Sequence, residues 1–236
     1  MKKVIIIGAT SGIGRELAGV FSEDGYIVGI TGRRLKRLEQ LKEKLPNLCF
    51  IKQMDVSSQG AVSDLKKLII EINGVDIIVI SAGVASIDTD LPWEKEAETI
   101  DTNVRGFAAM ANVAYHYFLQ KGSGHIVGIS SIAAIRGGGF PAYNASKAFV
   151  SNYLQSLQYI TEKNNSNMVI TDIQPGFVDT KMAKGEGLFW VSSLNKAANQ
   201  IYNVINKKKK HAYITKRWRL IAWLLKIIPD GVYNRL

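Results

Sequence analysis

A tyrosine and a lysine stand four residues apart, Tyr143 and Lys147, in the run Y-N-A-S-K within a long stretch of helical apolar periodicity. Residues at this spacing share one face of a helix, so the ammonium of Lys147 can lie close to the phenol of Tyr143. A fixed cation favours the phenolate and lowers the phenol pKa from about 10 toward neutral pH. The pair is therefore a candidate acid/base catalyst, although the same spacing also occurs in ordinary surface packing.

A glycine-rich turn near the N-terminus is a second candidate for chemistry. The apolar run Val4–Ile7 breaks into Gly8–Gly14, G-A-T-S-G-I-G, and a helical pattern follows. A strand, a glycine-rich turn and a helix start together place backbone N–H groups and the helix dipole against an anion such as a phosphate. The spacing is neither G-x-G-x-x-G nor a P-loop, and a tight turn with three glycines is the simpler alternative.

Short apolar runs alternate with helical patterns along the chain, and they predict the strands and helices that position these groups. These runs are typical of buried strands and cover residues 4–7, 27–30, 48–51, 77–80, 126–129 and 169–173. The alternation predicts right-handed crossovers and a parallel sheet. Ligands bind beyond the carboxyl ends of such strands, where the polar or glycine-containing motifs of this chain begin.

Several motifs in order give the chain a resemblance to a known family. They are Gly8–Gly14, Asp55-Val56, Ser81-Ala82-Gly83, Asn103 in N-V-R-G, Ile129–Ser131, Tyr143–Lys147, and Pro175-Gly176 with Val178 and Thr180. With them the chain resembles the single-domain short-chain dehydrogenases/reductases over nearly its whole length. It departs from the family pattern at Ile7 (usually Thr) and Ser81 (usually Asn), and the stretch before Tyr143 is one residue short. The resemblance implies a doubly wound, Rossmann-type α/β fold.

The resemblance also implies a set of site residues and their roles. Tyr143 would exchange a proton with the substrate, Lys147 would hold the nicotinamide ribose, Ser131 would bind the reacting oxygen, and Asn103 would hold a water next to Lys147. The implied cofactor contacts are Gly8, Thr10, Ser11, Gly12, Ile13, Gly14, Arg33, Arg34, Asp55, Val56, Ser81, Ala82, Gly83, Asn103, Tyr143, Lys147, Pro175, Gly176, Val178 and Thr180.

The serine motif offers two hydroxyl groups, Ser130 and Ser131. Counting back from Tyr143 by the usual family spacing selects Ser130, whereas alignment from the preceding strand selects Ser131. Loops tolerate a deletion more easily than a strand tolerates a register shift, which exchanges its two faces. We therefore predict Ser131 as the catalytic hydroxyl and keep Ser130 as the alternative.

Charge at the end of the second strand indicates which cofactor is bound. An acidic residue there binds the ribose 2′-OH of NAD, whereas arginine accommodates the 2′-phosphate of NADP. This chain reads Thr31-Gly32-Arg33-Arg34, with no carboxylate to repel a phosphate. We predict NADP(H), and a merely solvated basic helix start is the alternative.

Length and composition favour one domain. The chain has 236 residues, 47% of them apolar, and no linker rich in Pro, Gly or Ser divides it. We expect residues 1–236 to form one dinucleotide-binding catalytic domain, in which residues 177–195 form a substrate lid. Its apolar side chains, Met182, Leu188, Phe189 and Trp190, favour a hydrophobic carbonyl compound or alcohol, unless the lid only packs on its own domain.

Cysteine usage and the chain start bear on location. One cysteine, Cys49, excludes an intramolecular disulfide and forms no metal-binding cluster, so we expect a cytoplasmic protein without a metal. The start M-K-K-V-I-I-I resembles a signal peptide, but its apolar run ends at Gly8 and no small-residue cleavage site follows. We interpret it as the first strand.

The net charge of the chain is +10, and most of it belongs to the basic, apolar C-terminal segment, residues 206–236. This segment contains nine basic residues and one acidic residue, Asp230, so its net charge is +8. Within it, residues 207–228 are candidates for peripheral contact with an anionic membrane, since the apolar stretch is too short to span a bilayer. A subunit interface in a homo-oligomer, a dimer or tetramer, is the slightly favoured alternative. Specific nucleic-acid binding is not expected, because one lysine cluster lacks a reading motif.

These observations predict an NADP-dependent oxidoreductase that transfers a hydride between a nicotinamide cofactor and a small-molecule carbonyl or secondary alcohol. A noncatalytic dinucleotide-sensing or membrane-docking protein on the same scaffold is the alternative. The intact set Ser131, Tyr143 and Lys147 argues against it, because a binding module does not need an activated phenol.

Overall fold

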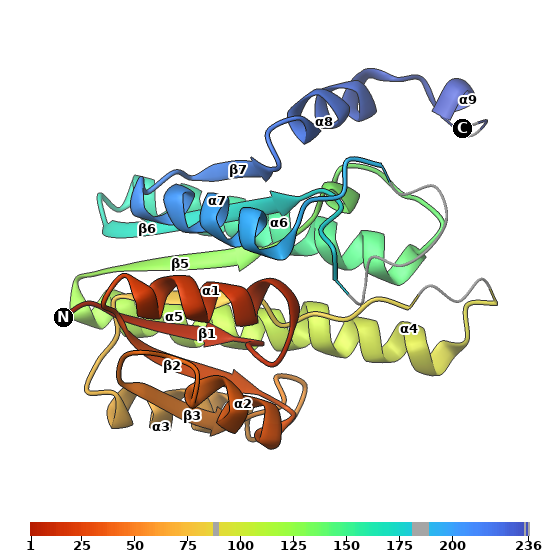
Figure 1. Cartoon of the computed structure of the whole chain (residues 1–236). Coiled ribbons are helices and arrows are strands. Elements are labelled where there is room, and N and C mark those ends of the chain that lie inside the picture. The colour runs from red at the N-terminus through yellow and green to blue at the C-terminus, as the bar shows by residue number, and fades with distance from the viewer. Residues whose placement is uncertain (87–89, 181–188, 234, 236) are drawn as a thin grey trace.

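A computed structural model shows one seven-stranded parallel sheet and describes residues 1–86, 90–180, 189–233 and 235. The strands are β1 (Lys3–Ile7), β2 (Ile27–Gly32), β3 (Cys49–Gln53), β4 (Ile77–Ile80), β5 (Ser123–Ile129), β6 (Asn167–Pro175) and β7 (His211–Ile214). Their spatial order is β3-β2-β1-β4-β5-β6-β7, which runs from one edge of the molecule to the other in Figure 1. The order reverses direction at β1, as in a doubly wound fold, so the predicted fold class is confirmed.

Helices lie between successive strands and after the last strand. They are α1 (Gly12–Glu23), α2 (Leu35–Lys42), α3 (Ala61–Glu71), α4 (Trp93–Ile100), α5 (Phe107–Lys121), α6 (Pro141–Lys163), α7 (Leu194–Asn206), α8 (Trp218–Ile227) and α9 (Asp230–Tyr233), with a π-helical turn η1 (Asp101–Gly106) and a 3₁₀ turn η2 (Ile132–Ala134). No helix among the described residues is long and apolar enough to cross a membrane.

Alternation of side chains along the strands builds a core on each face of the sheet. In β1, Ile5 and Ile7 pack with Leu68 of α3 and Leu154 of α6, whereas Val4 and Ile6 pack on the opposite face with α1, α2 and α7. Both faces of a parallel sheet are covered in this way, which explains why its strands read as continuous apolar runs.

The seventh strand was not predicted. β7 lies at the start of the segment interpreted as a basic, apolar C-terminal tail, and it pairs in parallel with β6, with His211 opposite Asp172. It has four residues and follows a lysine run, so its sequence carries little strand signal. The pairing with the β6 edge creates the strand, and residues 206–236 are therefore not one uniform segment.

The predicted lid is described only in part. Residues 181–188, which include Met182 and Leu188, lie outside the described residues. At its base, Val178 forms an isolated bridge with Ser192, and α7 begins at Leu194. The rings of Phe177, Phe189 and Trp218 lie in contact, with centroids 5.1–5.9 Å apart. The apolar residues of the lid base therefore pack on α8.

Candidate functional site

A cleft of about 1390 Å³ opens at the carboxyl ends of β1, β2, β3, β4, β5 and β6. The predicted site residues that line it are Gly8, Thr10, Ser11, Gly12, Ile13, Arg33, Arg34, Asp55, Val56, Ser81, Ala82, Gly83, Ser131, Tyr143, Lys147, Pro175, Gly176, Val178 and Thr180. Gly14 and Asn103 do not line it. The parallel sheet thus brings together residues from seven separate stretches of sequence. Six of them follow strands that end at the same edge, and the seventh, with Tyr143 and Lys147, lies on α6.

The glycine-rich turn packs tightly against the loop that follows β4. Gly8 has φ +93°, and a Cβ there would lie 2.5 Å from the backbone nitrogen of Ala82. A Cβ on Gly14 would lie 2.5 Å from the carbonyl oxygen of Gly8. The absence of a side chain at Gly14 thus lets α1 approach the turn closely, and its contact with a cofactor stays a prediction.

The arginines after β2 occupy the cleft end that was expected to hold the adenine ribose. Arg34 donates from Nε (3.1 Å) and Nη2 (2.5 Å) to Thr10 Oγ1, and from Nη2 to Ser11 Oγ (3.0 Å). A Cβ on Gly32 would lie 2.5 Å from Thr10 Cγ2, so a side chain at this position would collide with the turn. Arg34 is thereby held against the glycine-rich turn.

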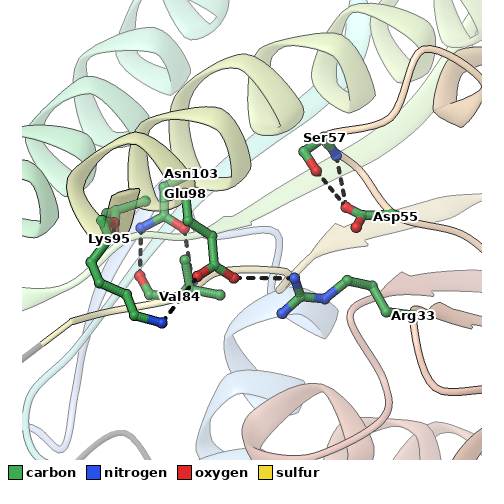
Figure 2. A network of polar contacts seen from close by, with 8 residues as sticks. Arg33, Asp55, Ser57, Val84, Lys95, Glu98 and Asn103 are labelled. Atoms are coloured by element: carbon green, nitrogen blue, oxygen red, sulfur yellow. Dashed lines mark hydrogen bonds and ion pairs between the residues drawn. The ribbon is translucent and has the colours of Figure 1, made fainter. Parts of the chain in front are cut away.

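Figure 2 shows Arg33 extended toward α4, where its Nη1 lies 3.3 Å from Oε1 of Glu98. Both side chains are about half exposed, and ion pairs at this level of exposure contribute little free energy. Arg33 can therefore exchange this partner for a phosphate at small cost. Asp55, in the same view, accepts hydrogen bonds from the backbone nitrogen and Oγ of Ser57, which fixes the loop after β3.

The two serines at the end of β5 point in different directions. Ser131 Oγ accepts a hydrogen bond from the backbone nitrogen of Ala133 (3.1 Å) and is hydrogen-bonded to the phenol of Tyr143. Ser130 Oγ donates instead to the carboxylate of Asp172 and to the carbonyl of Ile173 (3.0 Å). Of the two hydroxyl groups, the one on Ser131 thus lies beside the candidate acid/base.

Tyr143 and Lys147 lie one turn apart in α6, with the ammonium 5.7 Å from the centroid of the phenol ring. Burial raises the pKa of Tyr143 above its usual value, and the hydrogen bond with Ser131 opposes this rise. The spacing of Tyr143 and Lys147 predicts a lowered pKa for this phenol. The difference arises because removing the hydroxyl from water disfavours the phenolate, a cost that spacing on a helix does not reveal.

Lys147 is buried, and its Nζ donates to the carbonyl oxygen of Ile129 (3.0 Å). Burial lowers its pKa to about 8, and the negative charge of Asp172 acts in the opposite direction. The ammonium therefore exists mainly in its charged form at neutral pH and loses its proton just above it.

Asn103 lies in the π-helical turn η1, behind the cleft wall. Its side chain accepts from the backbone nitrogen of Val84 and donates to the carbonyl of Val84, both at 2.8 Å, as Figure 2 shows. It also donates to Ser146 Oγ (3.0 Å). These bonds use its amide to position the loop after β4, and π-turns of this kind are frequent at functional sites.

The sequence patterns did not identify some of the residues that line the cleft. Arg37 adds a third guanidinium near Arg33 and Arg34, and Phe140 and Asn144 line the cleft beside Tyr143. Asn144 Nδ2 donates to the carbonyls of Ala133 and Arg136, both at 3.1 Å, and so supports the loop between Ser131 and α6. The position of Arg37, one helical turn after Arg33, could have indicated that it lines the same cleft. Nothing in the local sequence reveals the role of Asn144.

No cluster of His, Cys, Asp or Glu suited to a metal ion occurs within the part of the chain that the structure describes. The groups around the cleft include hydroxyls, an ammonium group, guanidinium groups and backbone amides, together with the separate carboxylates of Glu16, Asp55 and Asp179. Guanidinium groups and backbone amides bind phosphates, and the hydroxyl and ammonium groups can transfer protons.

Comparison with known proteins identifies the family. The sequence model of the short chain dehydrogenases matches residues 2–188. The chain belongs to this family, and its members are oxidoreductases that use a nicotinamide cofactor. An uncharacterized oxidoreductase from Myxococcus xanthus is 35% identical over 188 residues, which cover 77% of this chain and 74% of that protein.

An NADP-dependent 3-hydroxy acid dehydrogenase, YdfG, from Escherichia coli K12 is 34% identical over 190 residues, covering 74% of this chain and 72% of that one. Among solved structures, a short-chain dehydrogenase from Sphingobium yanoikuyae in complex with NADPH has a TM-score of 0.82 at 21% identity, and covers 100% of this chain and 94% of its own. A short-chain dehydrogenase/reductase from Burkholderia phymatum in complex with NAD has a TM-score of 0.83 at 17% identity. This match covers 94% of this chain and 92% of that chain. At these identities the two structures support the fold only.

Proposed function

We propose that this protein is an NADP(H)-dependent oxidoreductase that interconverts a hydrophobic carbonyl compound and the corresponding secondary alcohol. The arrangement of one cleft carries the proposal. Ser131, Tyr143 and Lys147 line one part of it, and Arg33 and Arg34 line another, at the end of β2. A proton donor, an oxygen-binding hydroxyl and phosphate-binding guanidinium groups therefore face the same cavity.

The residues present fit a dinucleotide with a 2′-phosphate. The glycine-rich turn offers backbone amides at the start of α1, and Gly32 leaves no carboxylate where an acid would bind the ribose of NAD. NADPH would supply the hydride. The name of the E. coli relative, which specifies NADP, agrees with this choice.

The catalytic residues have separate roles in carbonyl reduction. Tyr143, with its raised pKa, holds its proton at neutral pH and donates it to the substrate oxygen. Ser131 donates a hydrogen bond to that oxygen as negative charge develops on it. The positive charge of Lys147 stabilises the tyrosinate that remains after proton transfer.

The apolar part of the cleft supports a hydrophobic substrate. Ile132, Phe140 and Phe177 line it near Ser131 and Tyr143. Phe177 in turn packs on Trp218, which is 3% exposed, so this wall is backed by a buried aromatic cluster. Burying apolar substrate surface against such side chains contributes to binding roughly in proportion to the area removed from water.

The test of this proposal is a screen of ketones, aldehydes and secondary alcohols with NADPH and with NADH, followed by nicotinamide absorbance. We expect turnover with at least one apolar carbonyl compound and a preference for NADPH. The noncatalytic alternative predicts NADPH binding without turnover of any member of the panel.

Replacing both Arg33 and Arg34 by alanine is expected to raise the KM for NADPH about tenfold or more, and to change the KM for NADH much less. The lost charge-assisted hydrogen bonds to a 2′-phosphate are worth about 1.5–3 kcal/mol. Lys36→Ala, at the same basic helix start but outside the cleft lining, is the matched control. An equal loss for both cofactors would show that the arginines do not select the 2′-phosphate.

The rate of carbonyl reduction should depend on pH through Lys147. Its pKa of about 8 means that the charge is present below that pH and is lost as the pH rises through it. The phenol of Tyr143, whose pKa is raised, stays protonated over this range. We expect kcat/KM to fall above about pH 8, because kcat/KM reports ionisations of the free enzyme.

The pH profile of Lys147→Arg is the control for this prediction. A guanidinium stays charged throughout the range, so a folded variant with residual activity should lose the decrease near pH 8. A wild-type profile that remains flat through this region would contradict the role given to the ammonium.

We also propose that the enzyme works in the cytoplasm and forms a homo-oligomer. Cys49 is buried, and burial raises its thiol pKa to about 11, which suits a thiol that stays reduced. Light scattering of the purified protein measures the oligomeric state, and a monomeric mass at working concentration would contradict that part of the proposal.

A further inference from the structure

Helix α8 is apolar on both of its long faces. Its inner face carries Trp218 and Ala222, both almost fully buried against Ile132. Its outer face carries Leu220, Trp223 and Ile227, which are 68%, 63% and 55% exposed, with Leu224 beside them. A surface helix normally places polar residues on the side away from the core. This outer face is therefore an apolar surface without a partner among the described residues.

The outer face belongs to a rigidly held part of the chain. Arg136 Nη1 donates to the carbonyls of Leu225 (3.3 Å) and Ile228 (2.5 Å), and its Nη2 forms an ion pair with Asp230. Tyr233 donates from its hydroxyl to the carbonyl of Gly137 (2.6 Å). In Figure 1, α8 and α9 stand beyond β7 at the edge of the sheet, and no other described element lies on their far side.

A basic groove lies beside α8. It has a volume of about 1180 Å³ and runs between the ends of α6 and α7, β7 and α8. Its cationic lining residues are Lys207, Lys209, Lys216, Arg219 and Lys226. Among the described residues, none of these five forms an ion pair.

The groove has one acidic lining residue, Asp172, and it is 4% exposed. Its carboxylate accepts hydrogen bonds from Ser130, Ser151 (2.6 Å) and Gln174 (3.0 Å). Asp172 forms no ion pair among the described residues, and its one negative charge is outnumbered by the five cations of the groove lining. The groove therefore presents a net positive charge next to an exposed apolar helix face.

We infer that the outer face of α8 and this basic groove together dock on an anionic lipid bilayer, with α8 lying in the plane of the interface. Apolar side chains on the helix enter the boundary of the acyl chains, and the adjacent cations bind lipid phosphates. A tryptophan such as Trp223 suits this boundary, because one end of its ring is apolar and the other is polar.

Charge distinguishes this partner from a second copy of the chain. A twofold interface across α8 would bring Arg219 and Lys226 of both copies together. The acidic residue on this part of the chain, Asp230, is already paired with Arg136. Like charges without acids between them oppose such an interface, whereas a bilayer with anionic headgroups complements them.

The residues that form the docking surface do not line the catalytic cleft. Neither Leu220 and Trp223 of α8 nor Lys207 and Lys209 of the groove belong to the cleft lining. A binding assay therefore tests the surface separately from activity.

The test is co-sedimentation of the full-length protein with vesicles of phosphatidylcholine alone and of phosphatidylcholine mixed with phosphatidylserine. We expect binding to the anionic vesicles, weakened by added salt because screening reduces the surface potential. Binding to neutral vesicles should be weaker by about tenfold or more, since several cations near an anionic surface each contribute to the partition. Equal binding to both vesicles, or to neither, would overturn the inference.

Two variants locate the surface. Leu220→Ser combined with Trp223→Ser removes apolar contacts, and Lys207→Gln combined with Lys209→Gln removes charge. Each should lower anionic-vesicle binding about tenfold or more. The matched controls lie on α3, where Ile70→Ser removes an exposed apolar residue and Lys66→Gln with Lys67→Gln removes two exposed charges.

The controls should bind vesicles as the wild type does, and circular dichroism should show that every variant is folded. Undiminished binding by both α8-groove variants would contradict the inference. So would a fall in the oligomer mass of Leu220→Ser/Trp223→Ser without any vesicle binding by the wild type, because that result assigns the face to a second copy.

Discussion

Replacing Tyr143 by phenylalanine is expected to lower kcat for carbonyl reduction by about a hundredfold to ten-thousandfold, the range typical of a positioned proton donor. The substitution removes one hydroxyl and leaves the ring, so α6 and the cleft wall keep their shape. NADPH affinity, measured by fluorescence titration, should stay close to that of the wild type. The result would separate catalysis from cofactor binding in the same cleft.

Tyr153→Phe is the matched control for this prediction. Tyr153 lies on the same helix and packs against Phe107 and Phe149, outside the cleft lining. Its loss of a hydroxyl should leave kcat unchanged. If Tyr143→Phe retained kcat near that of the wild type, another group would have to supply the proton.

Replacing Ser131 by alanine is expected to lower kcat by about a hundredfold to a thousandfold, as the removal of one donor to a developing oxyanion does. Ser131 is hydrogen-bonded to Tyr143, so its hydroxyl is placed next to the oxygen that receives the proton. The measurement is steady-state reduction of the substrate found in the carbonyl screen, with NADPH saturating.

Ser130→Ala should affect a different property. Its hydroxyl holds Asp172 and the carbonyl of Ile173, so the variant leaves buried hydrogen-bonding groups unpaired. We expect a loss of stability of about 1–3 kcal/mol and a much smaller change in kcat. A large loss of kcat in Ser130→Ala together with normal kcat in Ser131→Ala would reverse the assignment of the two serines.

The sheet shows how far sequence patterns determine a fold of this kind. β1 and β4 are apolar runs that are buried on both faces, and their signal does not depend on what pairs with them. β7 is different, since His211–Ile214 lacks such a run and becomes a strand through the free edge of β6. The C-terminal segment was for this reason interpreted as a uniform tail.

The same distinction applies to the candidate site. The spacing of Tyr143 and Lys147 is local, so the helix alone places them on one face. The choice between Ser130 and Ser131 depends on the course of the chain after β5, which directs Ser130 to Asp172 on β6 and Ser131 to Tyr143 on α6. Asn103 was interpreted from its motif, but its contacts with Val84 require η1 to cross the loop after β4.

Sequence by itself thus determined the parallel α/β fold, the edge at which the site assembles, and the residue types that meet there, because periodicity and spacing along one element are local properties. Only the tertiary structure decided the raised pKa of Tyr143, the pKa of about 8 at Lys147, and the juxtaposition of the α8 face with the basic groove. Burial and proximity depend on atoms far apart in the chain, and no local pattern records them.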